Sequence, residues 1–197
     1  MEHQHASRGG AVLAALLCAP AFAQAPAGAT HYSSEQAKSS LEFAFAQAGA
    51  QNKGKFTKFS VTLDASADGT AASRLDVTVE MATFDTDDKE RNDTLKGPDL
   101  FDVAKFPQAH FIATQITKTA TGFDAVGKLT LRGVTRDLHV PFTLRATKEQ
   151  GHAVAYLAGR TTLRRLDFGV GQGDWKSTEW VGNDVTVSYS VTLVAAQ

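Results

Sequence analysis

The chain has 197 residues, 21% of them charged, and a formal net charge of -1. This near-neutral balance of charges excludes broad nucleic-acid binding, which depends on clustered positive charge. The only cysteine, Cys18, lies in an apolar N-terminal run, so the rest of the chain has no thiol for a disulfide, a nucleophile or a metal ligand. About 170 residues remain beyond that run, enough for one domain with one hydrophobic core.

The N-terminus has the features of an export signal. The short apolar run AVLAALLCAPAFA ends in Ala21-Phe22-Ala23, the small-x-small pattern of a signal-peptidase site. It is shorter than the ~20 apolar residues that a transmembrane helix needs. We therefore expect a signal peptide over residues 1–23, a flexible lead-in over 24–33, and a single exported domain over 34–197.

Strands with a period of two come next. Apolar and smaller or polar residues alternate over Leu41–Ala46, and a turn is expected over Gly49–Gly54. A second strand is predicted over Lys55–Asp64. After an Asp68-Gly69 turn, a third strand over Leu75–Met81 has one apolar face and one polar face.

The alternation breaks between residues 85 and 107, where we predict a short helical insertion. Thr86 is expected to cap the first turn of the helix, and the acidic residues Asp87 and Asp88 suit the positive end of the helix dipole. Gly97-Pro98 is expected to interrupt the helix. The apolar residues of the insertion would then rest on the strands as a lid across one end.

Alternating strands then resume, over residues 110–117, 123–131, 137–146 and 152–167. Gly159 is expected to mark a bend or bulge in the last of these. The final strand, 185–193, alternates most regularly of all. The predicted fold is all-β: an antiparallel barrel of about eight strands with one helical insertion, because closure removes exposed strand edges.

A closed barrel of this size is either filled by side chains or holds one small ligand. The strands carry many alanines: Ala44, Ala46, Ala113, Ala125, Ala153, Ala155 and Ala158. These residues either leave interior space or pack tightly beneath large neighbours, and the sequence does not choose between the two. It also leaves open which face of each strand points inward.

Residue patterns for catalysis are missing from the sequence. It has no Gly-x-Ser-x-Gly elbow, no P-loop and no His-Glu-x-x-His zinc motif. The histidines beyond residue 23 are scattered without metal-ligand spacing: His31, His110, His139 and His152. We therefore expect no catalytic residue, no metal site and no cofactor.

A glycine-rich loop, GVGQGDWKSTEWVGND, separates the last two strands. Its glycines are wrongly spaced for a dinucleotide site, which indicates a turning or flexible loop. Trp175 and Trp180 in this loop either anchor it or shield the mouth of a cavity.

Three arginines are candidates for a role at a barrel mouth. A cationic group there would suit an anionic head group such as a phosphate. For Arg91 and Arg132, the sequence does not decide between that role and an ion pair with a nearby acid. For Arg165, an ion pair with Asp167 is the preferred interpretation.

A series of motifs runs along the chain in a characteristic order. They are Arg91-Asn92-x-x-Leu95, Asp99-Leu100-Phe101-Asp102-Val103, Phe106-Pro107, GKLTLRGVT at Gly127–Thr135, Arg165–Val170 and Val181–Val185. Their order and spacing, across nearly the whole chain beyond residue 23, resemble the YceI family of periplasmic isoprenoid-lipid-binding proteins. Asn92 stands where the family usually has Asp, which weakens any head-group role for that position.

The resemblance implies a lipocalin-like barrel in the periplasm that holds an isoprenoid quinone or a polyprenyl phosphate in an apolar tunnel. The implied tunnel residues are Phe43, Phe45, Val77, Val79, Phe101, Phe106, Phe111, Leu129, Leu131, Phe142, Val187, Tyr189 and Val191. Leu100, Phe101 and Phe106 would close one end of the tunnel. The head-group candidates are Arg91, Arg132 and Trp175.

Three functions compete at this point. The first is a periplasmic carrier of isoprenoid lipid, a monomer or homodimer with transient membrane contact. The alternative is a non-catalytic envelope-stress module with a filled core, in which the loop around Trp175 and Trp180 contacts a protein partner. The third, an enzyme acting on the lipid head group, is disfavoured because only His139 or His152 would be available as a base.

Overall fold

The structure is a computed structural model that describes residues 28–196. The predicted signal peptide, residues 1–23, lies outside the described residues, as do residues 24–27 of the predicted lead-in.

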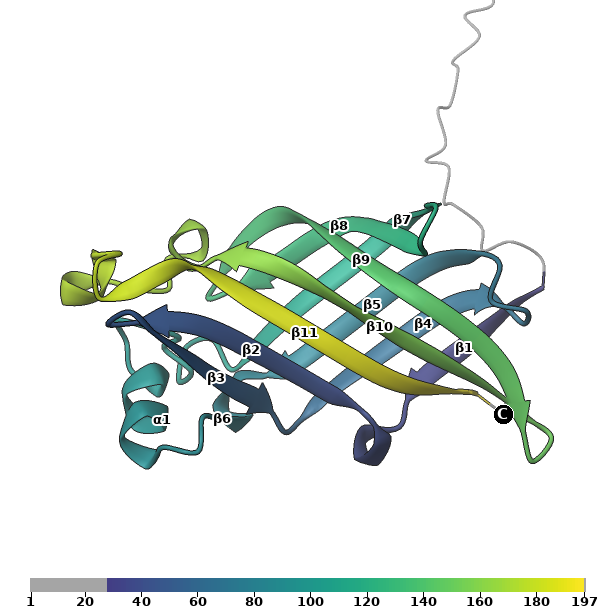
Figure 1. Ribbon diagram of the computed structural model, residues 1–197, viewed down its shortest axis with the longest axis horizontal. Coiled ribbons are helices and arrows are strands. Elements are labelled where there is room, and N and C mark those ends of the chain that lie inside the picture. The colour runs from purple at the N-terminus through teal and green to yellow at the C-terminus, as the bar shows by residue number, and fades with distance from the viewer. Residues whose placement is uncertain (1–27, 197) are drawn as a thin grey trace, which may run out of the picture.

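Eleven strands and one α-helix make up the described chain (Figure 1). The strands are β1 (Ala29–Ser34), β2 (Ser40–Gln47), β3 (Ala50–Phe56), β4 (Phe59–Ser66), β5 (Ala72–Glu80), β6 (Phe84–Asp85), β7 (Gln108–Lys118), β8 (Phe123–Leu131), β9 (Val134–Glu149), β10 (His152–Arg164) and β11 (Val181–Ala195). The helix is α1 (Lys89–Lys96), and the short 3-10 turns are η1 (Gln36–Lys38), η2 (Met81–Thr83), η3 (Arg165–Phe168) and η4 (Gly173–Lys176).

The sheet closes into an antiparallel barrel. Hydrogen-bonded neighbours run β1-β4-β5-β7-β8-β9-β10-β11, and β1 also pairs with β11, which completes a ring of eight strands. β2, β3 and β6 extend the same sheet from β11 at one end. The predicted fold class is confirmed.

Short breaks divide three long barrel strands. η1 separates β1 from β2, Thr57 and Lys58 separate β3 from β4, and η2 separates β5 from β6. The turn predicted over Gly49–Gly54 is wrong, because Ala48 and Gly49 alone form the β2–β3 turn and residues 50–54 belong to β3. Both turn residues have positive φ, 50° and 78°, as tight hairpin turns require.

Residues 29–33 of the predicted lead-in are also strand. They form most of β1, which pairs with β4 on one side and with β11 on the other. The segment ATHYSS has only Tyr32 as a large apolar residue, so its alternation is too weak to predict a strand. Hydrogen bonding to β4 and β11 along its two edges keeps this segment in a strand although its alternation is weak.

The helical insertion lies where it was predicted, but its cap differs. The carboxylate of Asp88, not the hydroxyl of Thr86, accepts the Arg91 N–H at 3.0 Å and caps α1. The helix ends at Lys96, and Gly97 caps it as expected. The insertion occupies the gap left where β6 turns away from β7 to pair with β3 (Figure 1).

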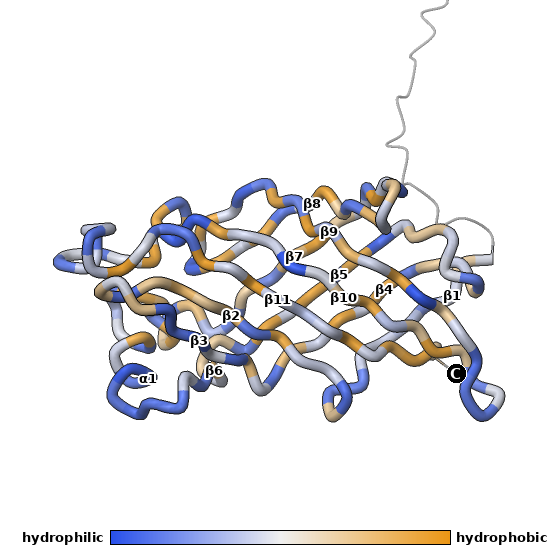
Figure 2. The backbone as a smooth tube through the Cα atoms, viewed as in Figure 1, coloured by the Kyte–Doolittle hydropathy of each residue, from blue (hydrophilic) through white to orange (hydrophobic). Residues whose placement is uncertain are grey.

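Hydrophobic residues point into the barrel in alternation with polar ones, which appears as alternating colours along the strands in Figure 2. At the end that carries the β4–β5, β7–β8 and β9–β10 hairpins, the interior is filled with side chains. Tyr32, Leu63 and Leu193 are fully buried there, and the rings of Phe123 and Phe142 stack at 5.4 Å. We call this end the filled half.

The interior alanines belong to this filled region. Ala113, Ala125 and Ala155 have no exposed surface. Ala44 and Ala46 lie on the opposite face of β2 from the buried Phe43 and Phe45. Tight packing beneath large neighbours is therefore the correct interpretation of the interior alanines.

Candidate functional site

A cavity of about 430 Å³ occupies the other half of the barrel, nearest α1. Its walls are mainly aliphatic and aromatic side chains from β2 to β5 and from β7 to β11. Asp88, Glu90 and Thr94 of the insertion also line it, and because these residues are exposed the cavity reaches solvent there. We call this opening the mouth and this half of the barrel the mouth half.

Most of the tunnel residues implied by the resemblance line this cavity. They are Phe43, Phe45, Val77, Val79, Phe101, Phe111, Leu129, Leu131, Val187, Tyr189 and Val191. Leu100, expected to close one end, lines it too. That these side chains contact a lipid remains a prediction.

Phe106 and Phe142 lie outside the cavity lining, which corrects the predicted set. Phe142 belongs to the filled half, where it stacks on Phe123. Phe106 lies beneath the β8–β9 turn, with the Arg132 guanidinium 6.0 Å from the centre of its ring and Gly133 against its edge. Both side chains stabilise the barrel around the cavity instead of facing it.

Two glycines in the wall allow aromatic rings to lie flat along it. A Cβ on Gly54 would come within 2.4 Å of the Phe43 ring, and one on Gly159 within 2.7 Å of the Tyr189 ring. Each glycine pairs across the strands with the residue whose ring covers it. The rings therefore cover the wall and leave the interior open. Gly159 allows this close approach, and the β9–β10 pairing ends at Gly159 and Phe142.

Tyr189 is fixed in this position by its hydroxyl, which donates to the carbonyl of Pro141 in β9. Burial raises the pKa of the Tyr189 phenol above its ordinary value, and the charge of Asp124 raises it further. The phenol is thus a neutral donor at any physiological pH.

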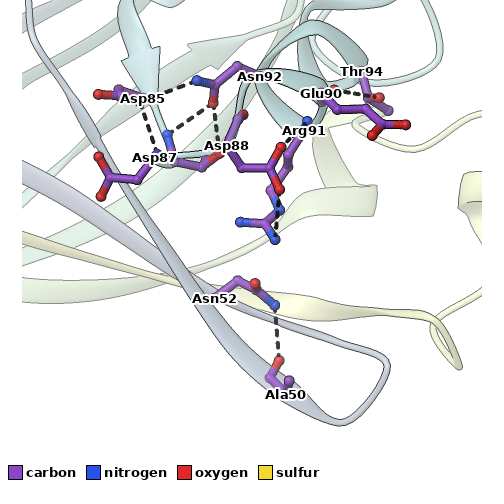
Figure 3. Close-up of polar contacts among 10 residues, drawn as sticks. Ala50, Asn52, Asp85, Asp87, Asp88, Glu90, Arg91, Asn92 and Thr94 are labelled. Carbon is purple, nitrogen blue, oxygen red and sulfur yellow. Dashed lines mark hydrogen bonds and ion pairs between the residues drawn. The ribbon is translucent and has the colours of Figure 1, made fainter.

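The mouth carries charges of both signs. The Arg91 guanidinium lies 3.6 Å from the Asp88 carboxylate, and its side chain points from α1 toward β3, which carries Asn52 (Figure 3). Glu90 lines the same opening. Arg91 is therefore at the mouth, as a head-group candidate should be, and it is also ion-paired.

Asn92 holds the start of the insertion and does not line the cavity. Its side-chain oxygen accepts the Thr86 N–H at 3.0 Å and the Thr86 hydroxyl at 2.7 Å, and its amide donates to the Asp85 carboxylate at 3.2 Å (Figure 3). The pKa of Asp85 is lowered, first by the N–H of Asp87 and then by this amide. An aspartate at position 92 would place a second negative charge against Asp85.

The other two head-group candidates differ from each other. The Trp175 side chain lines the cavity near the mouth, while its backbone N–H bonds to the Gln172 carbonyl. Trp175 therefore both anchors its loop and borders the cavity. Arg132 does not line the cavity, and it donates to the carbonyl of Pro98 at 2.6 Å.

Arg165 does not form the predicted ion pair with Asp167. The Arg165 residue is 5% exposed, and its guanidinium donates five hydrogen bonds to backbone carbonyls, those of Val170, Trp175, Ser177, Val181 and Gly182. Arg164 is the residue near the Asp167 carboxylate, at 4.0 Å. Burial lowers the pKa of Arg165. This side chain ties together the loop from 165 to 182 and also lines the cavity.

The histidines lie away from the cavity. His31, His110 and His139 each contact an aspartate on a neighbouring strand: Asp64 at 2.6 Å, Asp76 at 2.8 Å and Asp124 at 2.8 Å. His152 is exposed at the β9–β10 hairpin, at the filled end. Among residues 28–196, no three metal-ligating side chains are grouped as a metal site would need. Over the same residues, no helix has both the length and the apolar character to cross a bilayer.

Several lining residues were absent from the predicted set: Phe59, Val61, Leu75, Leu138, Val140, Leu157 and Leu163. They alternate along β4, β5, β9 and β10 like those that were named. The same period-two pattern would have found them once the inward face of each strand was known.

The chain matches the family model of the YceI-like domain over residues 32–193. A UPF0312 protein of Yersinia pestis (strain Pestoides F) is 36% identical over 83 residues, which is 42% of this chain and 43% of that protein. A UPF0312 protein of Yersinia enterocolitica gives the same identity and coverage. The matched stretch thus spans less than half the length of these curated relatives.

Solved structures share the fold. BcnA of Burkholderia cenocepacia is 30% identical with a TM-score of 0.72, covering 81% of this chain and 98% of that one. Two further structures share only the fold with this chain. A YCEI protein of Campylobacter jejuni is 22% identical with a TM-score of 0.67, covering 73% of this chain and 85% of that one. A polyisoprenoid binding domain from Saccharophagus degradans is 15% identical with a TM-score of 0.60, covering 84% of this chain and 98% of that one. With the family match covering most of the chain, the resemblance is confirmed: this chain belongs to the YceI-like domain family.

Proposed function

We propose that the protein binds an isoprenoid lipid in the barrel cavity and carries it through the periplasm. The observation that supports this most directly is an apolar cavity of about 430 Å³ that reaches solvent at the mouth. Its volume falls within the range of roughly 300–1,000 Å³ typical of small-molecule sites. The Saccharophagus degradans neighbour, described as a polyisoprenoid binding domain, supports the same ligand class.

The chemistry of the wall suits a long hydrocarbon tail. Each CH₂-sized unit removed from water contributes about 0.8 kcal/mol, so a prenyl chain gains affinity along its whole length. Such a ligand needs few polar contacts, which agrees with the lack of a strong polar motif in the sequence.

Charge balance at the mouth favours a neutral quinone or phenol over a polyprenyl phosphate. The lining contains two arginines, Arg91 and Arg165, and two acids, Asp88 and Glu90. Arg91 is paired with Asp88, and the hydrogen bonds of Arg165 go to backbone carbonyls. A phosphate would have to displace these partners, whereas a neutral head group would not.

The proposed role is binding without catalysis. His139 and His152, the only bases considered for a head-group hydrolase, lie away from the cavity. The alternative of an interaction module assumed a filled core, and the cavity argues against that assumption. Export to the periplasm is supported by the N-terminal sequence pattern.

Native mass spectrometry of the protein exported by a bacterial host, paired with solvent extraction, tests the proposal. We expect a bound species of prenyl-lipid mass that extraction identifies as a quinone or phenol. A bound polyprenyl phosphate would keep the carrier function and contradict the head-group preference. Protein that is empty, and remains empty after incubation with both lipid classes, would contradict the function itself.

A further inference from the structure

The indole of Trp180 is unusually exposed for its size. Trp180 is 69% exposed and is the only large hydrophobic side chain of the described residues in that state. It immediately precedes Val181, which lines the cavity, and Val181 pairs with Gln47, another lining residue at the end of β2. The exposed indole thus belongs to the rim of the mouth.

The neighbouring hairpin has matching properties. The N–H of Ala48 donates to the Trp180 carbonyl at 2.7 Å, so the tip of the β2–β3 hairpin lies beside the indole. From Ala44 to Asn52 the hairpin carries no charged residue, and Ala48, Gly49 and Ala50 at its tip are exposed. Figure 1 shows this hairpin and the loop before β11 side by side at the same end as α1.

We propose that Trp180 and the uncharged tip of the β2–β3 hairpin form a docking surface that places the mouth on a phospholipid bilayer. This inference rests on the proposed function, because an isoprenoid lipid resides in a bilayer and must cross the rim to reach the cavity. Tryptophan suits the boundary between water and hydrocarbon, since its ring is apolar and its N–H can remain hydrated.

The charges near the surface indicate which bilayer it fits. Lys176 and Glu179 lie on the loop beside Trp180, and Lys53 follows the hairpin tip on β3. With both signs present, the surface does not select anionic lipid, as a polybasic patch would. Docking is therefore expected to occur through the indole on zwitterionic vesicles and to change little when anionic lipid is added.

Measuring how fast the protein takes up its ligand from two sources separates docking on a bilayer from binding in the cavity. The ligand is a prenyl quinone, presented either in phosphatidylcholine vesicles or dispersed in detergent. Trp180→Ala should slow loading from vesicles by roughly ten-fold or more, because most of an indole would no longer be buried in the interface. Its loading from detergent should be unchanged.

A second variant controls for the number of tryptophans. Trp180→Ala combined with His152→Trp moves the indole to the exposed β9–β10 hairpin at the filled end. This double variant should load from vesicles as slowly as Trp180→Ala. Brominated phosphatidylcholine should quench tryptophan fluorescence in the wild type and much less in Trp180→Ala.

The outcomes are distinct. Equal loading rates from vesicles for the wild type and Trp180→Ala, with no quenching by brominated lipid, would overturn the docking surface and leave Trp180 to a protein partner. Failure of the wild-type protein to load either the prenyl quinone or a polyprenyl phosphate from detergent would instead overturn the proposed function. Recovery of fast vesicle loading in the double variant would show that the position of the indole does not matter, which also contradicts the inference.

Discussion

The two halves of the barrel use the same kinds of apolar side chain, yet only one of them is filled. In the filled half, Tyr32, Leu63 and Leu193 are fully buried. In the mouth half, Leu163 on β10 and Val187 on β11 line the cavity and are only half-buried. Residue type alone therefore does not decide whether the interior of this barrel is packed or open.

The difference arises from backbone pairing. In the filled half, β1 pairs with both β4 and β11 and closes the ring directly. In the mouth half, β6 pairs with β3, and the β5–β7 pairing stops at Glu80 and Gln108. The insertion then supplies that part of the wall, and the glycines beneath Phe43 and Tyr189 keep the rings flat against the sheet.

Filling the open half is expected to have the largest effect on function. Val187→Trp places an indole in existing space, so the protein should fold but lose all detectable bound lipid. Native mass spectrometry of the exported protein measures this directly. Ser188→Trp, at the next residue and on the outer face, is the matched control and should keep its lipid. Unchanged lipid in Val187→Trp would mean that the ligand lies elsewhere.

Removing matched leucines from the two halves should separate their stabilities. Leu63→Ala in the filled half should reduce the free energy of unfolding by roughly 3–5 kcal/mol, because it leaves an enclosed void. Leu163 borders a cavity that already exists, so Leu163→Ala should reduce the free energy of unfolding by less than about 2 kcal/mol. Urea unfolding midpoints at unchanged slope provide the measurement. Equal losses would show that the mouth half is as tightly packed as the other.

In the mouth half, Arg165 holds the loop from 165 to 182 in place. Arg165→Leu should reduce the free energy of unfolding by about 3 kcal/mol, since five backbone carbonyls lose this donor. Arg165→Lys keeps the charge but lacks the planar fork, so it should recover only part of the loss. Chemical denaturation of the three proteins tests this, with limited proteolysis of the 165–182 loop as a local readout. Full recovery by lysine would assign the effect to charge and not to geometry.

The smallest effect is expected at the start of the insertion. The pKa of Asp85 is lowered in the folded protein, so the stability it provides is present above its unfolded pKa and is lost as pH falls through the lower folded pKa. Asn92→Asp replaces a donor to Asp85 with a like charge, which should destabilise the protein at pH 7 and raise the folded pKa of Asp85. The stability difference from the wild type should then shrink as pH falls toward about 3.9, the ordinary aspartate pKa. A difference independent of pH across that range would argue against repulsion between the two carboxylates.

Much of the fold was predictable because the strands alternate clearly. The bounds predicted for β8, Phe123–Leu131, are those observed, and the helical insertion and the end of its helix at Gly97 were found. The errors fall where pairing or side-chain contacts override the local pattern. β1 has little alternation, Asp88 displaces Thr86 as the helix cap, and the neighbours of Arg165 come from a loop whose path the sequence does not reveal.

For the candidate site, the sequence identified many lining residues but not the shape they enclose. Phe142 and Phe111 have the same alternating pattern, yet one lies in the filled half and the other faces the cavity. The sequence by itself determined the strand pattern, the insertion and the family, because these depend on local periodicity and motif order. Only the tertiary structure decided which half is hollow, where the mouth lies and which charges meet there, because strand pairing, the breaks between strands and contacts between distant loops set these together.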